Sequence, residues 1–454
     1  MSLNALADAL GSSRLVTDPD VMDAYTRDEA HLAVPGLPLA VLVADSTEDV
    51  AAALKWATEH KVPVVPRGAG SGLAGGATAI DGCLVVSTAA MRDIVELNPA
   101  DQLAVVQAGV VNADLDRAAA EHGLMYAPDP SSFQISTIGG NIATNAGGLR
   151  CVKYGVTRDS VLGLEVVLAD GRILHTGHRT VKGVAGYDLT GLLVGSEGTL
   201  GIVTGATVRL RPRPSREPAT IVGSFPSLRA AADAVAAVVR AGIGPSLLEL
   251  IDRATLVAID EWKRIGLEAG TEAMLIAQAD GPDADEAAAA IERLFSEAGA
   301  DFVALSQDPA ESAQLLGIRR LAYPAAERLG QCLVEDVGVP RSRLPEMVES
   351  IEEISRRHDV TVMTVAHAGD GNVHPTFVFD RRADGSVPDA VWTAADEVFR
   401  RALELGGTLT GEHGVGVLKR RWMALEVGET GLDIHRAVKA AFDPLGLMNP
   451  GKGF

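Results

Sequence analysis

The chain has 454 residues, of which 47% are hydrophobic and 22% are charged, and its formal net charge is −20. This length provides for two or three domains with full hydrophobic cores. The acidic balance argues against a nucleic-acid-binding protein. The three widely spaced cysteines predict neither a disulfide framework nor a thiolate metal cluster. Because no signal peptide or long apolar span is apparent, we expect a cytoplasmic protein that is not transmembrane, with peripheral association at a membrane left open.

The N-terminal half has many short predicted strands. Residues 1 to about 35 are polar and read as helical. Ser46 and Asp49 have the spacing of a helix start, so a helix is predicted over residues 46–60. Many short strands combined with few helices predict an α+β domain. The predicted strands are residues 39–44, 64–65, 83–87, 103–107 and 161–168.

The segment of residues 66–76 is dense in glycine, carries one cation, and lies between two apolar runs. Without Cβ atoms, successive backbone N–H groups can converge on an anion. We therefore interpret this segment as a phosphate-binding loop. A glycine-rich surface turn is the simpler alternative.

The same loop matches the G-x-G-x-x-G motif of the Rossmann fold at Gly70, Gly72 and Gly75. That motif requires a helix directly after the loop, within a βαβ unit. Here the predicted helix precedes the loop and a predicted strand follows it. The sequence therefore disfavours a Rossmann domain.

Two prolines and two arginines at residues 211–214 mark a domain boundary. Beyond them, strands alternate with longer helices, which is typical of a second α+β domain. The C-terminal tail, residues 442–454, is neither helix nor strand, yet it is apolar enough to be docked on the protein. The predicted elements of the second domain are strands at 221–224, 247–251, 273–277 and 302–305, and helices at 228–241 and 285–298.

Two further glycine-rich segments follow the first. Residues 136–148 combine small residues with two amides and three hydroxyls, which suits close packing around a planar polar ring system. A long loop packed on itself is the alternative. Residues 195–203 form a similar turn that leads into a strand, so this segment is also expected to approach a ligand or another backbone.

His367 and His374 flank Asp370-Gly371, a favoured pair for a two-residue hairpin turn. With that turn, the two histidines would be directly opposed on one face, with Cβ atoms about 4.5–5.5 Å apart. Two imidazoles so placed can bind one divalent ion, whereas a lone histidine is more often structural.

Glu412 lies in a glycine-flanked loop beside His413. Glu412 would complete a metal site of two histidines and one carboxylate, with a coordination position open for substrate. His413 would then remain as a general base. The spacing does not establish that this loop reaches the histidines, and an ordinary loop with an exposed carboxylate is the alternative.

Together, these segments resemble those of the FAD-dependent 2-hydroxyacid dehydrogenases of the vanillyl-alcohol oxidase / p-cresol methylhydroxylase superfamily. This group includes the FAD subunit of glycolate oxidase, D-lactate dehydrogenase and D-2-hydroxyglutarate dehydrogenase. The resemblance covers roughly residues 35–454. It implies three parts: a two-part PCMH-type FAD-binding domain at residues 1–213, an α+β substrate (cap) domain with an antiparallel sheet at 214–410, and a segment at 411–454 that returns to the flavin and completes the active site.

The resemblance also implies roles for single residues. The metal, commonly zinc, would be bound by His367, His374 and Glu412, and His413 would be the catalytic histidine. FAD would bind non-covalently, because no histidine lies between His60 and His122. The implied FAD contacts are Pro66, Arg67, Gly68, Ala69, Gly70, Ser71, Gly72, Gly75, Pro128, Ser136, Thr137, Gly140, Asn141, Thr144, Gly147, Glu197, Ile202 and Asn449.

Arg319 matches the arginine that holds a substrate acid group in the 2-hydroxyglutarate relatives. Tyr323 stands where those relatives have a threonine, and Val334 or Glu335 is near the position of their lysine. This departure favours D-lactate or glycolate over a dicarboxylate. The predicted reaction oxidises a D-2-hydroxyacid to the 2-oxoacid by hydride transfer to FAD, with Arg319 holding the carboxylate.

Other functions are weighed against this one. They are D-2-hydroxyglutarate oxidation, a metal-free FAD oxidase of alcohols or sugars, a metal hydrolase, and a non-catalytic flavin-binding subunit of a redox complex. The electron acceptor (quinone, cytochrome or flavoprotein), the metal's identity, and assembly as a homodimer or a complex subunit are left open.

Overall fold

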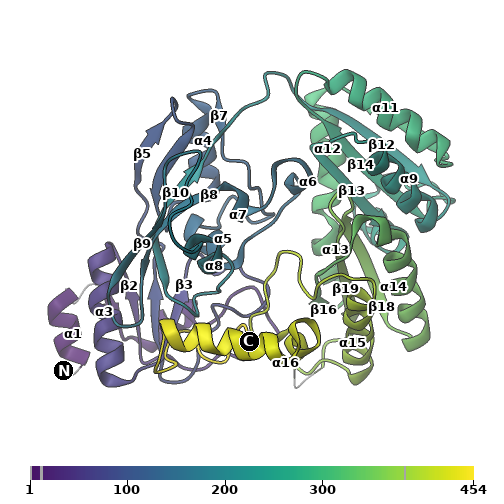
Figure 1. The fold of residues 1–454 in the computed structure, drawn as a ribbon. Coiled ribbons are helices and arrows are strands. Elements are labelled where there is room, and N and C mark those ends of the chain that lie inside the picture. Colours follow the sequence, from purple (N-terminus) through teal and green to yellow (C-terminus); the bar gives the residue numbers. More distant parts are fainter. Residues whose placement is uncertain (1–2, 11–13, 383–384) are drawn as a thin grey trace. The chain divides into compact units, whose positions relative to one another are not determined.

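The computed structural model describes residues 3–10, 14–382 and 385–454. They divide into two compact units, each mixing helices and strands, which confirms the α+β prediction (Figure 1). The first unit comprises Met1–Gly148, Gly155–Arg213 and Glu412–Phe454, and the second comprises Leu149–Tyr154 and Pro214–Gly411.

The first unit contains two main sheets. One has the strand order β1-β2-β4-β3, in which β2, β4 and β3 are parallel and β1 is antiparallel. The other is antiparallel throughout, in the order β5-β6-β10-β8-β9. The bounds are β1 Leu15–Val16, β2 Ala40–Val43, β3 Val64–Arg67, β4 Leu84–Ser87, β5 Ile94–Asn98, β6 Leu103–Gln107, β8 Val161–Val167, β9 Ile173–Gly177 and β10 Ile202–Arg209. A short pair joins β7 (Leu124–Met125) and β11 (Arg211–Pro212).

The helices of the first unit are mostly short. α3 begins after Ser46, whose side chain accepts the N–H of Asp49, as the sequence predicts. The expectation of helix throughout the first 35 residues is wrong, because β1 lies there and pairs with β2, burying Leu15. The helices are α1 Leu3–Leu10, α2 Pro19–Met22, α3 Thr47–His60, α4 Asn112–Ala120, α5 Ile138–Thr144, α7 Thr157–Ser160, α8 Leu189–Leu193 and α16 Met423–Phe442, with 3-10 turns η1 Asp23–Tyr25 and η3 Arg420–Trp422.

The glycine-rich loop connects two parallel neighbours, β3 and β4. Residues 68–83 run from one strand to the other as turns and extended chain rather than as a helix. Because the Rossmann fingerprint needs a helix at this point, the structure excludes that fold here, in agreement with the sequence.

The C-terminal tail is docked on β3. Val64 donates its N–H to Leu447 at 2.8 Å, and Asn449 donates its N–H back to Val64 at 2.7 Å. Met448 is buried in the same core as α3 and β2. The tail therefore extends the parallel sheet beside the strand that leads into the glycine-rich loop.

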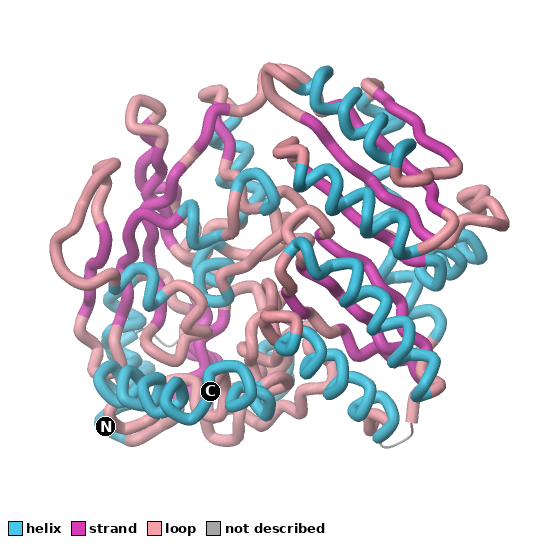
Figure 2. Tube along the Cα trace, turned by 45° about the vertical axis from the view of Figure 1, so that its right-hand side comes forward, coloured by secondary structure: helices cyan, strands magenta, loops and turns pink. Residues whose placement is uncertain are grey.

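The second unit is built on one antiparallel sheet, as the family resemblance implies. Its strand order is β15-β12-β14-β13-β18-β19-β16, and β17 also pairs with β19. Helices pack along the strands of this sheet (Figure 2). Their contacts put α9, α11, α14 and α15 in one group and α10, α12 and α13 in another. The strands are β12 Ala219–Phe225, β13 Leu247–Asp252, β14 Ala273–Ala279, β15 Phe302–Ser306, β16 Gln331–Val334, β17 Val337–Gly338, β18 Thr361–His367 and β19 Asn372–Phe379.

The helices of the second unit begin at well-formed caps. Ser227 caps α9, Asp252 caps α10 and Asp308 caps α12, each through a side-chain oxygen that accepts a backbone N–H. The helices are α6 Cys151–Tyr154, α9 Leu228–Arg240, α10 Arg253–Lys263, α11 Ala284–Glu297, α12 Pro309–Arg320, α13 Ala322–Leu329, α14 Leu344–His358 and α15 Asp389–Glu404, with the 3-10 turn η2 Arg341–Arg343.

Candidate active site

In the first unit, the glycine-rich loop closely approaches the start of α5. A Cβ atom added at Gly68 would lie 2.5 Å from Oγ1 of Thr137. Thr137 is the N-cap of α5, and its Oγ1 accepts the N–H of Gly140 at 3.3 Å. The segment of residues 136–148 is therefore not one long loop, since its middle is a helix. Only glycine at position 68 allows this close approach.

Buried polar atoms cluster around this loop. Among the described residues, Ser136 Oγ, Asn141 Nδ2 and Asn449 Oδ1 find no hydrogen-bond partner. Each of these residues is at most 3% exposed. A buried polar atom left unpaired costs roughly 1–3 kcal/mol, so these atoms fit a polar ligand that would satisfy them. The close backbone approach at Gly68 and these three polar atoms suit a dinucleotide such as FAD.

Arg67 is engaged within the protein. Its guanidinium donates to the main-chain carbonyls of Arg27 at 2.7 Å and Ala24 at 3.4 Å. It also lies 6.0 Å from the ring centre of Tyr25. Burial lowers the pKa of the Arg67 guanidinium, and the neighbouring Asp28 carboxylate opposes that shift. Arg67 thus fixes residues 24–27 against the glycine-rich loop.

All of the residues with a predicted FAD role lie in the first unit. Pro66 packs against Gly198, where an added Cβ would lie 2.7 Å from Cγ of Pro66. The Pro128 carbonyl accepts Nδ2 of Asn112 at 3.1 Å, and Thr144 Oγ1 donates to the Gly140 carbonyl at 3.3 Å. These contacts hold the residues at the ends of α4 and α5.

Glu197 connects three distant segments. Its buried carboxylate accepts the N–H groups of Val415 and Gly416, each at 2.7 Å. Its main-chain carbonyl accepts Nδ2 of Asn449 at 2.7 Å. Burial raises the pKa of Glu197, and the two backbone N–H bonds oppose that change. The carboxylate predicted to lie near a flavin therefore also fixes the loop that follows His413.

Glu412 and His413 lie at the start of the last segment of the first unit. Glu412 packs on Gly147, where an added Cβ would be 2.4 Å from its Oε2. Its Oε1 lies 3.7 Å from Nε2 of His413. Gly147 thus leaves room for the Glu412 side chain.

In the second unit, the predicted hairpin forms with a different register. Strand β18 pairs with β19 so that His367 is opposite Asn372, and Val365 is opposite His374. The two-residue turn at Asp370-Gly371 is therefore wrong, and the loop spans residues 368–371. Two neighbouring segments hold the wider loop in place. Gly369 donates its N–H to the Leu248 carbonyl at 3.1 Å, and Val339 donates its N–H to the Gly371 carbonyl at 2.9 Å.

The two histidines are adjacent despite this shift. His374 is two residues beyond Asn372, so its side chain is on the same face as His367. Their ring centres are 5.0 Å apart with planes at 83°. Both are buried, at 6% and 5% exposure. They form a diagonal cross-strand pair, which can present two ring nitrogens to one ion.

A carboxylate missed by the sequence reasoning joins His367 to Arg319. Glu249, on β13, accepts Nδ1 of His367 at 2.7 Å and Nε of Arg319 at 2.8 Å. Its side chain is fully buried, whereas that of Arg319 is 15% exposed. Burial alone would raise the pKa of Glu249, but the charges of His367 and Arg319 outweigh it, so the pKa is lowered. A lone acid within Leu247-Leu248-Glu249-Leu250-Ile251 was the available signal.

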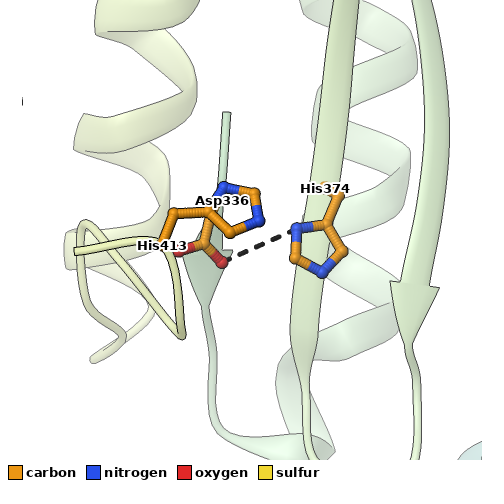
Figure 3. Close-up of side chains that lie close together, drawn as sticks. All are labelled: Asp336, His374 and His413. Atoms are coloured by element: carbon orange, nitrogen blue, oxygen red, sulfur yellow. Dashed lines mark ion pairs between the residues drawn. The ribbon is translucent and has the colours of Figure 1, made fainter. Parts of the chain in front are cut away.

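A second carboxylate lies beside His374. Asp336, between β16 and β17, has Oδ1 3.7 Å from Nδ1 of His374, and the dashed line in Figure 3 marks this ion pair. Thr410 donates its hydroxyl to the other oxygen of Asp336 at 2.7 Å. Glu335 is also buried here. Acidic residues directly after the apolar strand β16 were the sequence signal.

The second unit therefore fits a divalent metal. Metal-binding histidines usually direct their second ring nitrogen to a carboxylate, which orients the imidazole and makes it a better ligand. His367 and His374 each have a carboxylate at Nδ1. With Nδ1 directed to a carboxylate, Nε2 is the ring nitrogen that each histidine would direct to an ion.

Residues 38–177 match the family model "FAD binding domain", and residues 215–453 match "FAD linked oxidases, C-terminal domain". Glycolate oxidase subunit GlcD of Bacillus subtilis is 44% identical over 92% of this chain and 89% of its own length. D-lactate dehydrogenase of Anaerostipes hadrus is 34% identical over 98% of this chain and 95% of its own.

The fold also resembles solved structures. A crystal structure of p-cresol methylhydroxylase with substrate bound superposes with a TM-score of 0.82, at 17% identity, over 99% of this chain and 96% of that one. At this identity the likeness shows the fold alone, and that fold is the PCMH-type one expected from the sequence. Across the described residues, no helix is both long and apolar enough to cross a bilayer.

Proposed function

The chain belongs to the family of FAD-linked oxidases, and from that premise we propose that it oxidises a D-2-hydroxyacid, D-lactate or glycolate, to the 2-oxoacid. The observation that carries the proposal is the buried group in the second unit. There, His367 and Arg319 share the carboxylate of Glu249, and the ring of His374 lies beside that of His367. A cationic side chain can bind the carboxylate of a substrate, and a histidine pair that can bind a metal lies beside it. Together they suit an anionic substrate that also has a hydroxyl group.

Arg319 would bind the substrate carboxylate. Its Nε is engaged by Glu249, whereas its two terminal nitrogens form no hydrogen bond with the described residues. Those two nitrogens form a planar fork that matches a carboxylate with two parallel hydrogen bonds. We propose that the substrate carboxylate binds to Arg319 through these two parallel hydrogen bonds.

In this proposal His367, His374 and Glu412 would hold a divalent ion such as zinc, which would act as a Lewis acid and lower the pKa of the substrate hydroxyl. Chain connectivity supports the inclusion of Glu412. Thr410 is bonded to Asp336, beside His374, and Glu412 follows two residues later. Two residues of extended chain span about 7 Å at most.

His413 would take the hydroxyl proton. Imidazole suits this task because its ordinary pKa is near working pH. Bound FAD supplies the redox chemistry by accepting the hydride. The protein's part is to orient the substrate Cα–H through Arg319, to hold FAD non-covalently at the glycine-rich loop, and to remove the proton.

The residues near Arg319 favour a substrate with one acid group. Glu335, near the position where the 2-hydroxyglutarate relatives have a lysine, is a buried acid. An acid cannot serve as the cation that would bind a second substrate carboxylate. Tyr323, on α13, is 36% exposed. We therefore favour D-lactate or glycolate over D-2-hydroxyglutarate. Because a relative is named as a subunit of glycolate oxidase, we also propose that electrons leave through a partner such as a flavoprotein, cytochrome or quinone.

The test is anaerobic reduction of the purified flavoprotein by a panel of D- and L-2-hydroxyacids, followed at about 450 nm. We expect rapid bleaching by D-lactate or glycolate and slow bleaching by D-2-hydroxyglutarate. Bleaching only by sugars or simple alcohols, with no stoichiometric metal, would instead indicate a metal-free oxidase. A protein that binds no FAD would contradict the proposal.

A further inference from the structure

We propose that Glu249 is a positioning residue that holds the substrate-binding arginine and a metal-binding histidine as one rigid group. This inference rests on the function proposed above. The two carboxylate oxygens are divided between the partners, Oε1 at 2.7 Å from Nδ1 of His367 and Oε2 at 2.8 Å from Nε of Arg319. One carboxylate therefore sets the position of both side chains.

The position of Glu249 in β13 is otherwise an apolar core position. Leu247 and Ile251 are on the same face of the strand and belong to one hydrophobic cluster, with Val365 of the neighbouring strand. A carboxylate removed from water costs several kcal/mol unless charged partners bond to both oxygens. Packing alone would favour leucine at this position. An acid here is stable only with Arg319 and His367 in place.

The consequence for His367 is a defined ring orientation. Because Nδ1 faces a carboxylate, Nδ1 carries the hydrogen, and when the ring is neutral the lone pair that can bind a metal is on Nε2. Arg319 comes from α12, which packs over the same sheet. Its bond to Glu249 holds the end of this helix to β13 and directs the terminal nitrogens of the guanidinium away from Glu249. A change at Glu249 should therefore weaken metal binding and carboxylate binding together.

The same strand contains a matched control. Asp252 is also a buried acid, at 7% exposure, but its oxygens accept the backbone N–H groups of Thr255 and Thr364, each at 2.8 Å. It caps α10, and within the described part of the chain these hydrogen bonds involve neither Arg319 nor His367. Asp252→Asn therefore measures the effect of a change in β13 that leaves the bonds of Glu249 to His367 and Arg319 in place.

The experiment uses the FAD-bound full-length protein and two probes measured separately. Zinc binding to metal-free protein reports on His367. Oxalate binding to metal-free protein, read as a change in flavin absorbance, reports on Arg319. Glu249→Gln removes the negative charge that both partners share and replaces one acceptor oxygen with an NH₂ group, so both hydrogen bonds should weaken. We expect the zinc dissociation constant to rise 10- to 100-fold, and that of oxalate to rise about tenfold. Asp252→Asn should leave both constants within about twofold of wild type.

Glu249→Asp keeps two acceptor oxygens on a shorter stem, and we expect it to restore part of both affinities. It also provides the measurement if Glu249→Gln does not fold. Wild-type constants in both Glu249 variants, a change in only one of the two constants, or equal losses in Asp252→Asn would each overturn the inference. Failure of the proposed function is distinct: wild type itself would then bind no zinc and would not be reduced by any 2-hydroxyacid.

Discussion

The carboxylate of Glu197 accepts the backbone N–H of Gly416 at 2.7 Å, across 219 residues of sequence. The same residue has a left-handed backbone conformation, with φ of 51°, and its carbonyl accepts the side chain of Asn449. Glu197 thus joins the turn before β10, the loop that follows His413, and the docked tail. A residue expected beside the flavin also orders the loop of the proposed base.

Glu197→Gln should loosen that loop. A carboxamide has one acceptor oxygen where the carboxylate accepts two N–H groups, and losing a bond to a charged group costs roughly 1.5–3 kcal/mol. We expect a tenfold or larger fall in kcat with FAD still bound, measured by steady-state kinetics and flavin absorbance. Glu261→Gln, at an exposed position, is the control. An unchanged kcat in Glu197→Gln would contradict this role.

His413→Asn should abolish most of kcat, because the amide cannot accept the substrate proton at neutral pH. The variant should remain yellow, since the residues assigned to FAD are untouched. Rapid-mixing reduction of the flavin by substrate measures the chemical step directly. Wild-type reduction rates would show that another group removes the proton.

His374→Ala should lose the metal and the activity together while FAD is retained. His358→Ala is a matched control, because His358 also contacts a carboxylate, that of Glu397 at 2.9 Å, but lies on α14. Metal content by elemental analysis should fall from about one ion per chain to none only in His374→Ala. Full activity of chelator-stripped wild type would exclude a metal from the reaction.

Gly68→Ala should weaken FAD binding. The new methyl would lie 2.5 Å from Thr137 Oγ1 and displace the cap of α5, which is worth roughly 1 kcal/mol before any clash with the cofactor. Gly244→Ala is the control, because an added Cβ there meets nothing within 4 Å. The ratio of flavin to protein absorbance after gel filtration measures the loss. Equal flavin content in both variants would argue against a phosphate-binding role for this loop.

The stability of the protein should depend on Asp252 below neutral pH. Burial raises the pKa of Asp252 to about 6, above its value in the unfolded chain. The folded state then binds more protons than the unfolded state between about pH 4 and 6, so stability falls as pH rises through this window. Relative to Asp252→Asn, wild type should be more stable at pH 5 than at pH 7.5 by about 1.4 kcal/mol. Urea unfolding at the two pH values tests this, and a difference of opposite sign would contradict it.

Local sequence rules predicted several features correctly. The Ser46 cap, the absence of a helix after the glycine-rich loop and the strand–helix alternation beyond residue 214 follow from contacts within a few residues. The α+β class follows from the same short-range periodicity. The hairpin at residues 367–374 was also a local prediction, but its register was wrong because Leu248 and Val339 hold the turn from outside the hairpin.

The amino-acid sequence by itself determined the three glycine-rich segments and the presence of a hairpin that carries two histidines. Only the tertiary structure decided that Glu249 bonds both His367 and Arg319, and that Asn449 bonds the carbonyl of Glu197. Such pairs are 70 to 252 residues apart in the chain. No local periodicity encodes them, because a buried charge selects its partner through the packing of whole strands and helices.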